Sequence, residues 1–189
     1  MKELIKNIAR GCREFVLYVR YFHEFKSVGK RCVIQKPLRL FNMKNVTLGD
    51  RVYILPGLRM ETINQYGDQT FTPELIIEND VEIHQNCHIV AADSVIIHEH
   101  VSVGAGTMIN DCTHGYADLD LPFNEQPLTT KPIEIGKNTI IGNNVLILPG
   151  VKIGRNCYIG GNTVIAKSVP DYSIVSAPKP RAVVMPHED

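Results

Sequence analysis

The sequence predicts an all-β solenoid, in which one chain winds into about six triangular coils. Three observations support this fold class: an aliphatic residue recurs every six positions, these positions fall into six groups of three, and the spacing breaks only between groups. A period of six fits neither the 3.6 of a helix nor the 2 of a flat strand. Three units per group instead indicate a coil with three short sides.

The coils themselves are expected over residues 27–169. The residues expected at the axis are Val28, Ile34, Leu40, Leu48, Ile54, Met60, Ile77, Ile83, Ile89, Ile97, Val103, Ile109, Ile135, Ile141, Ile147, Ile153, Ile159 and Ile165. A small or β-branched residue often follows four positions later, as Cys87 follows Ile83. Stacked coils pair their backbones as parallel strands, so these side chains are expected to form one continuous core.

Four insertions interrupt the repeat, after Leu40, Met60, Ile89 and Ile109. Each follows the third unit of its group, so all four are predicted to leave the solenoid at the same corner. Two are long and form protruding loops at 61–76 and 110–134. Repeat proteins tend to collect insertions on the face that binds a ligand.

The two ends are expected to differ from the coils. Residues 1–26 are predicted to form a helical cap, with apolar residues at helical spacing and a basic remainder. The apolar positions are Ile5, Ile8, Cys12, Phe15, Val19 and Phe22, and the basic ones Lys2, Lys6, Arg10, Arg13 and Arg20. Two interpretations stay open: a plug over the first coil, or a contact with an anionic membrane surface. Residues 170–189 contain several prolines and are predicted to be an irregular tail that runs back along one side of the solenoid.

Composition limits the function classes. The 189 residues suffice for one domain, and no apolar run is long enough to span a bilayer. A formal net charge of zero argues against a duplex nucleic-acid binder. Five scattered cysteines do not suggest a disulfide framework. With no signal-peptide pattern at the N-terminus, a cytoplasmic location is expected.

The stretch "IGNNVLILPGVKIGRNCYIGGNTVIAKSV" resembles the hexapeptide-repeat acyltransferases, whose fold is a left-handed β-helix. The left-handed sense is implied by this resemblance, which covers roughly residues 25–184. Residues 86–114 are similar, without a gap, to the galactoside, maltose and serine O-acetyltransferase group. The loop "THGYADLDLPFNEQPL" is similar to O-acetyltransferases of capsule and lipopolysaccharide gene clusters.

The resemblance implies a catalytic base at His114, near the start of the longest loop. Imidazole suits proton transfer at neutral pH. The chain departs from the galactoside enzymes at two acceptor contacts, where His84 and Ala92 replace an asparagine and an acidic residue. The candidate acceptor-binding residues are therefore His84, Asn86, Asp93, Tyr116 and Asp118, with Gln126 a further loop residue that shapes the pocket or only folds the loop.

The same resemblance implies acetyl-CoA as acyl donor and a homotrimer with clefts between subunits. The residues implied for the coenzyme groove are Asn143, Gly161, Ala166, Lys167 and Arg181, and Lys179 is an extra candidate. No metal is expected, although γ-class carbonic anhydrases share the fold and bind zinc through histidines. His98 and His100 are predicted to share a strand face. Most cysteines occupy core positions, whereas the role of Cys112 stays open.

The leading hypothesis is transfer of an acetyl group from acetyl-CoA to a hydroxyl of a sugar or polysaccharide precursor. Two alternatives remain: an N-acetyltransferase acting on an amino-sugar nucleotide, and a non-catalytic β-helix that serves as an assembly module.

Overall fold

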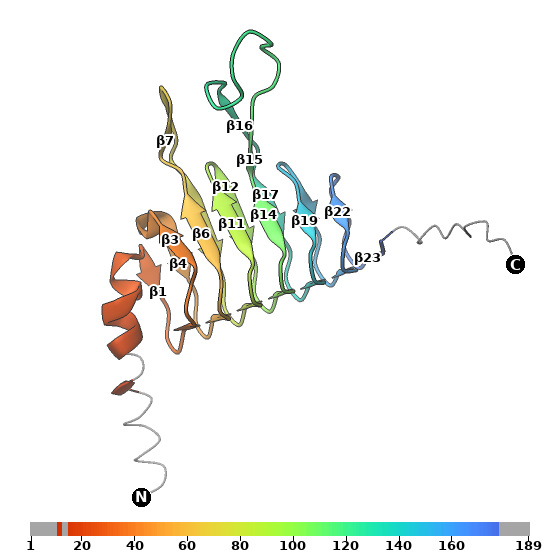
Figure 1. Ribbon diagram of the computed structural model, residues 1–189. Coiled ribbons are helices and arrows are strands. Elements are labelled where there is room, and N and C mark those ends of the chain that lie inside the picture. The colour runs from red at the N-terminus through yellow and green to blue at the C-terminus, as the bar shows by residue number, and fades with distance from the viewer. Residues whose placement is uncertain (1–10, 13–14, 178–189) are drawn as a thin grey trace, which may run out of the picture.

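The computed structural model describes residues 11–12 and 15–177, and over them the chain winds into a three-walled parallel β-helix (Figure 1). Wall 1 contains β1 (Ser27–Val28), β4 (Val46–Leu48), β9 (Glu74–Ile77), β12 (Ser94–Ile97), β17 (Ile133–Ile135) and β20 (Lys152–Ile153). Wall 2 contains β2 (Val33–Ile34), β5 (Tyr53–Ile54), β10 (Glu82–Ile83), β13 (Ser102–Val103), β18 (Ile140–Ile141), β21 (Tyr158–Ile159) and β23 (Ile174–Val175). Wall 3 contains β3 (Arg39–Phe41), β6 (Arg59–Thr62), β11 (His88–Ala91), β14 (Met108–Asn110), β19 (Leu146–Ile147) and β22 (Val164–Ile165).

The predicted aliphatic positions form the core. Sixteen of the eighteen are buried, and the other two, Val28 and Leu40, are partly buried in the first coil and pack against the core. Strand register stacks the positions in columns, for example Ile54, Ile83 and Val103 along wall 2. Burying each such side chain stabilises the fold by about 1.5–3 kcal/mol relative to exposure. The six-residue period is therefore the packing period of the core.

The corners between walls require a left-handed backbone. Asn138, Asn144, Asn156 and Asn162 all have φ between 53° and 57°. Asparagine tolerates this conformation better than most residues. Its side chain also links neighbouring coils, because Asn144 Nδ2 donates to Asn162 Oδ1 at 3.4 Å. Repeated asparagines at these positions thus turn the chain and connect successive coils.

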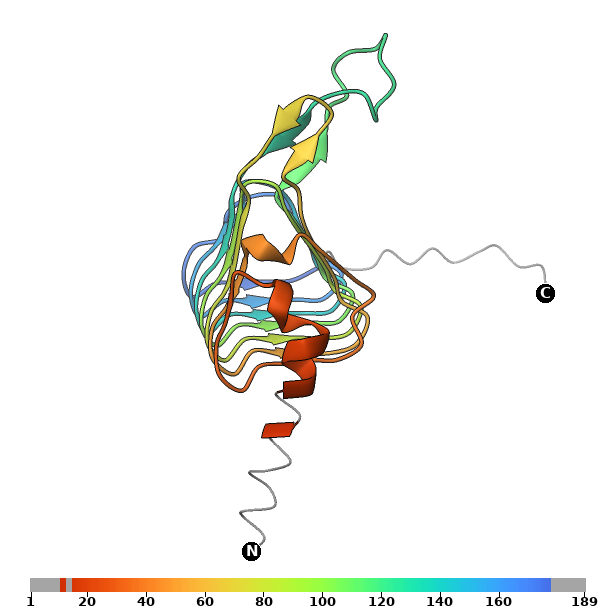
Figure 2. The ribbon, with the colours of Figure 1, turned by 90° about the vertical axis from the view of Figure 1, so that its left-hand side faces the viewer.

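All four insertions leave the solenoid at the corner between walls 3 and 1, as predicted. The first forms the 3₁₀ turn η2 (Met43–Asn45), and the third adds only two residues before β12. The second forms the antiparallel hairpin of β7 (Gln65–Tyr66) and β8 (Gln69–Thr70). The fourth forms the antiparallel hairpin of β15 (Cys112–His114) and β16 (Leu128–Thr130). Figure 2 shows the two hairpins projecting side by side from this corner.

The N-terminal cap packs differently from the prediction. Residues 11–12 and 15–20 are helical and are followed by the 3₁₀ turn η1 (Phe22–Glu24). Phe22 and Phe25 are buried, and Leu17 and Tyr21 pack partly against the core. The predicted packing face is wrong at Cys12, Phe15 and Val19, which are all exposed, the last two at 68% and 56%. Among the described residues, the helix packs against the core through its last turn. Ile5 and Ile8, like the basic residues Lys2, Lys6, Arg10 and Arg13, lie outside the described residues.

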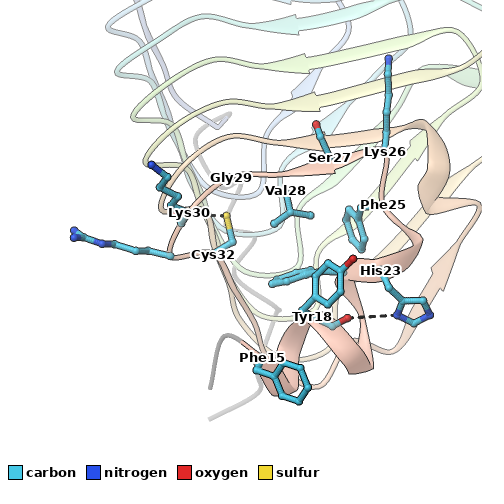
Figure 3. A pocket seen from close by; sticks show the side chains of 12 residues that line it. Phe15, Tyr18, His23, Phe25, Lys26, Ser27, Val28, Gly29, Lys30 and Cys32 are labelled. Carbon is cyan, nitrogen blue, oxygen red and sulfur yellow. Dashed lines mark hydrogen bonds between the residues drawn. The ribbon is translucent and has the colours of Figure 1, made fainter. Parts of the chain in front are cut away.

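A pocket of about 560 Å³ lies between this helix and the first coil (Figure 3). Its helical side is formed by Phe15, Tyr18 and Phe22, and its coil side runs from Lys26 to Cys32. No residue of either hairpin lines it, so it is separate from the protruding loops. Within the described residues, no helix combines the length and apolarity needed to cross a bilayer.

The C-terminal segment adds to the solenoid before leaving it. Val169 bridges Ile153, and β23 pairs in parallel with β21. The prediction of an irregular chain after Val169 is therefore wrong at residues 174–175. Pro170 precedes this strand at a turn, where its missing N–H removes no bond of the ladder. Residues 178–189, which include Lys179 and Arg181, lie outside the described part of the chain.

Candidate active site

His114 lies at the end of β15, on the hairpin that projects furthest from the solenoid (Figure 1). Cys112 and His114 are two residues apart on an extended strand and so share a face. At the base of that face, Cys112 is buried with Val90 and Ala92. Farther along the strand, His114 is exposed. The strand thus begins in an apolar cluster and presents the imidazole beyond it.

Asp111 anchors the base of this hairpin. Its side chain is fully buried, and its two carboxylate oxygens accept the backbone N–H groups of Ala92 and Asp93 at 2.7 and 2.8 Å. The Asp111 carbonyl accepts the N–H of Lys131 at 2.8 Å, which closes the hairpin. Burial raises the pKa of this carboxyl, partly offset by the hydrogen bonds that it accepts. Asp111 therefore ties the longest insertion to the short insertion of the preceding coil at the same corner.

Tyr66 of the neighbouring hairpin contacts His114 directly. The Tyr66 hydroxyl lies 3.0 Å from His114 Nδ1, and it donates to the carbonyl oxygen of Asn124 at 2.7 Å. The rings of Tyr66 and Phe123 meet the imidazole edge-on, with centroid distances of 5.2 and 5.8 Å. Two aromatic rings and one hydrogen bond thus hold the histidine in place.

Gln69 joins the two hairpins at a second point. Its side-chain Nε2 donates to the carbonyl of Leu128 at 3.1 Å, and its Oε1 accepts the N–H of Leu128 at 2.6 Å. This amide therefore satisfies both backbone groups of one residue on β16. Since Leu128 pairs with His114 in the hairpin, the bond fixes the strand opposite the histidine.

A pocket of about 380 Å³ lies beside His114. It is lined by wall 3 below and by both hairpins at the side, through Arg59, Glu61, Ile63, Tyr66, His88, Val90, Asn110, Cys112, Thr113, His114 and Leu128. The lining combines an apolar base with a few polar groups, as ligand pockets usually do. His114 thus lies beside a space that a small ligand can enter.

Wall 3 places a charged cluster at this pocket, in which Arg59, Glu61 and His88 line the pocket and Arg39 lies outside its lining. Glu61 is buried and contacts two guanidinium groups, Arg59 Nη2 at 2.9 Å and Arg39 Nε at 2.8 Å. Burial favours the neutral acid, but the hydrogen bonds and charge of Arg59 outweigh it and lower the pKa of Glu61. His88 lies beside them, and its buried Nε2 has no hydrogen-bond partner among the described residues. Burial, followed by the charge of Arg59, lowers the pKa of His88. The cluster has one cation in excess when His88 is neutral.

The predicted acceptor residues do not all meet in one chain. His84 and Asn86 lie at the corner between walls 2 and 3, in the turn that follows β10. Asp93 lies at the corner of the hairpins, where its N–H is bonded to Asp111. Wall 3 therefore separates the first two from the corner that bears His114.

The predicted coenzyme-binding residues also lie at two different corners of the solenoid. Asn143 and Gly161 lie together at the corner between walls 2 and 3, where Asn143 Oδ1 accepts the N–H of Ala105 at 2.9 Å. A Cβ at Gly161 would lie 3.0 Å from the carbonyl of Asn143, so this close stacking favours glycine. Ala166 and Lys167 are exposed at the corner between walls 3 and 1.

The loop residues differ in their contacts. Tyr116 is 85% exposed, so its ring is available to a ligand. The backbone of Asp118 is held by the buried side chain of Gln126, which accepts its N–H at 3.2 Å and donates to its carbonyl at 2.7 Å. Gln126 thus folds the loop, and Asp118 accepts the N–H of Asp120 at 3.0 Å.

Within the described part of the chain, His98 and His100 do not form a metal site, and Cys112 is not a reactive thiol. β12 ends at Ile97, and His100 lies in a left-handed turn with φ of 58°, so His98 and His100 do not share a strand face as predicted. No group of three His, Cys, Asp or Glu side chains suited to a metal occurs among the described residues. Burial, aided by the charge of Asp111, raises the pKa of Cys112 to about 12, which leaves its thiol protonated.

Sequence reasoning did not identify Tyr66, Gln69 or Asp111. The first two contact residues that are 48 and 59 positions away along the chain. The one available signal was that the two long insertions leave the same corner of the solenoid.

Comparison with known proteins agrees with this architecture. The family model described as bacterial transferase hexapeptide (six repeats) matches residues 132–167. The chain is 23% identical to WbbJ of Escherichia coli, named as a lipopolysaccharide biosynthesis O-acetyl transferase, over 85% of this chain and 80% of that protein. It is 34% identical to the acetyltransferase Rv3034c of Mycobacterium tuberculosis over 59% of this chain and 36% of that protein.

The repeat of residues 132–167 is thus that of the bacterial hexapeptide transferases. A crystal structure of AntD, an N-acyltransferase from Bacillus cereus, is similar to this chain with a TM-score of 0.68 and 18% identity. The match covers 85% of this chain and 83% of AntD, which in that structure binds dTDP-4-amino-4,6-dideoxyglucose and coenzyme A. The predicted left-handed β-helix is thereby confirmed as the fold.

Proposed function

We propose that this protein moves the acetyl group of acetyl-CoA to a hydroxyl of a sugar or polysaccharide precursor, with His114 as general base. The observation that supports this most is the position of His114 beside an open pocket of about 380 Å³, held by Tyr66 through one ring nitrogen. Tyr66 contacts Nδ1 of His114, and no described residue hydrogen-bonds Nε2. Nε2 is therefore free to bind an acceptor.

The chemistry follows from this arrangement. The imidazole removes the proton of the acceptor hydroxyl as its oxygen attacks the thioester carbonyl carbon. The C–S bond then breaks, and the thiolate of coenzyme A takes the proton back from the imidazolium. No covalent enzyme intermediate is required, since the acceptor oxygen is itself the nucleophile. This agrees with the buried, protonated thiol of Cys112, which is a poor nucleophile.

The proposal is tested with the full chain, acetyl-CoA and a panel of soluble glycans and nucleotide-sugars, with free thiol as readout. We expect thiol release that depends on acceptor, and His114→Ala to reduce it at least about 100-fold, the usual contribution of a general base. His114 is exposed, so the variant should remain folded. His23→Ala is the matched control, because this exposed histidine lies in η1, before the first coil and on neither hairpin. Full activity in His114→Ala would exclude the base.

Amide formation is the second candidate. Its support is the structural similarity to AntD, an N-acyltransferase, since the same base and donor can serve an amine acceptor. Treatment of the acetylated product with hydroxylamine separates the two cases, because esters cleave under conditions in which amides persist. Loss of the acetyl label favours the hydroxyl acceptor, and its retention favours the amine.

A homotrimer belongs to the same proposal. Wall 2 exposes Ile140, Tyr158 and Ile174 on neighbouring strands, an apolar strip suited to a subunit contact. A neighbour packed there would lie near the corner of His84, Asn86, Asn143 and Gly161, and could combine those residues with the hairpin corner of another subunit. The donor and acceptor contacts predicted from the sequence would then meet between chains.

Two further predictions concern location. The helix at 15–20 exposes Phe15, Val16, Tyr18 and Val19, which supports a peripheral contact with an anionic membrane surface. The cytoplasmic location stays a prediction.

A further inference from the structure

We propose that Tyr66 is a positioning residue that holds His114 in the tautomer with hydrogen on Nδ1, so that Nε2 is the basic nitrogen. This inference rests on the proposed function for its catalytic consequence, but the tautomer itself can be measured without any substrate. Tyr66 belongs to the first long insertion and His114 to the second, so the proposal also gives the first hairpin a role.

The assignment follows from counting protons. A tyrosine hydroxyl has one hydrogen to donate, and a backbone carbonyl can only accept. Tyr66 Oη lies 2.7 Å from the carbonyl oxygen of Asn124, so its hydrogen points there. The remaining contact, 3.0 Å to His114 Nδ1, then requires that Nδ1 donates to the lone pair of Tyr66. A neutral imidazole with hydrogen on Nδ1 has its free lone pair on Nε2.

The surrounding contacts keep the ring in this orientation. Phe123 meets the imidazole edge-on at an interplanar angle of 90°, and Tyr66 meets it at 67°. Gln69 brackets Leu128, the residue paired with His114 on the opposite strand, and so fixes the two hairpins to one another. Rotation of the ring would break the bond to Tyr66 and lose both aromatic contacts.

The chain of hydrogen bonds from His114 through Tyr66 ends at the backbone carbonyl of Asn124, a neutral group. In the described part of the chain, no carboxylate forms a hydrogen bond or ion pair with His114. Tyr66 and Asn124 therefore orient the imidazole through dipoles, without placing a full negative charge beside it. During the reaction Nε2 takes the acceptor proton and later returns it to the coenzyme A sulfur, while the hydrogen on Nδ1 stays directed at Tyr66.

The test compares native protein with Tyr66→Phe, which removes the hydroxyl and keeps the ring. The full chain is labelled with ¹⁵N-histidine, and the ring nitrogens of His114 are recorded at about pH 8, where an ordinary imidazole is neutral. His114→Ala assigns the signals. We expect native His114 to show a protonated Nδ1 and an unprotonated Nε2, and Tyr66→Phe to show a mixture of tautomers. Tyr53→Phe, which removes a hydroxyl bonded to Gln35 on wall 2, should leave His114 unchanged.

Turnover supplies the second readout. Tyr66→Phe should lower kcat about tenfold, the factor that corresponds to one hydrogen bond, with little change in KM for acetyl-CoA. A native His114 with hydrogen on Nε2, or a Tyr66→Phe variant with an unchanged tautomer, would overturn the proposal. A native protonated Nδ1 together with no acetyl transfer to any acceptor would instead contradict only the proposed function.

Discussion

Cys112 and His114 share one face of one strand, yet their environments assign them different chemistry. The thiol is buried in the cluster with Val90 and Ala92, and burial raises its pKa to about 12. The imidazole two residues later is exposed and bonded to Tyr66. At the residue scale, exposure therefore distinguishes the candidate base from its neighbour better than residue type does.

This difference predicts the pattern of cysteine alkylation. In native protein at about pH 8, iodoacetamide should modify Cys12, which is exposed, and spare Cys112, because a buried thiol is both inaccessible and protonated. Burial likewise raises the pKa of Cys87 to about 11. Peptide mass spectrometry after a short reaction measures each site. Modification of Cys112 as fast as Cys12 would contradict the packing described for the hairpin base.

Charged side chains join successive coils along wall 1. His98 follows β12 and lies between two acidic residues of adjacent coils, with Nδ1 3.1 Å from Glu78 and Nε2 3.0 Å from Glu134. Lys152 in the next coil contacts Glu134 at 2.8 Å. At the element scale, this ladder connects four coils through their outer surface, in addition to the aliphatic columns inside.

The ladder predicts a pH-dependent stability. Burial lowers the pKa of His98, but hydrogen bonds to Glu134 and Glu78 outweigh it and raise the pKa overall. A raised folded-state pKa gives stability that is full below the ordinary value near 6.5 and is lost as pH rises through the folded value. His98→Gln should therefore lower the free energy of unfolding more at about pH 5.5 than at about pH 9, by up to about 1 kcal/mol.

Thermal unfolding of both proteins at the two pH values checks this prediction. His23→Gln is the control, since His23 is exposed and its contact with Glu24 is 3.8 Å long. An equal Tm difference for His98→Gln at both pH values would show that the ladder contributes no linked stability.

The residues predicted to bind the acceptor and the coenzyme lie at two corners of the molecule, which are separated by wall 3. Asp93, Ala166, Lys167 and the His114 hairpin occupy one corner, and His84, Asn86, Asn143 and Gly161 occupy the other. A long, thin donor such as acetyl-CoA would require both groups to face one cleft. At this scale, the proposed packing of a second subunit on wall 2 would bring them together.

Sedimentation velocity tests this arrangement. We expect the native chain to sediment as a trimer, because the apolar strip of Ile140, Tyr158 and Ile174 would otherwise be left in water. Tyr158→Arg should shift the distribution towards smaller species, since it places a charge within that contact. A native protein that sediments only as a monomer would contradict the trimer and the shared cleft.

Local pattern made much of the fold predictable. The aliphatic period located the core positions, and the breaks in that period identified the corner from which the insertions leave. The buried residues of the N-terminal helix were harder to predict. Phe15 and Val19 fit an apolar helical face, but among the described residues the helix packs against the core through its last turn. β23 was also missed, since prolines near a strand end do not exclude pairing outside their own positions.

The sequence by itself determined a three-sided solenoid, its core, the common corner of its insertions and a candidate base in the longest one. The first three of these features depend on residues close together along the chain, where spacing directly sets which side chains share a face, whereas the base was implied by the resemblance to known enzymes. Only the tertiary structure decided that Tyr66 and Gln69 hold the loop of His114, that Asp111 anchors it and that Cys112 is buried. The Tyr66 and Gln69 contacts join residues 48 and 59 positions apart, and they exist only because stacking the coils brings two insertions together.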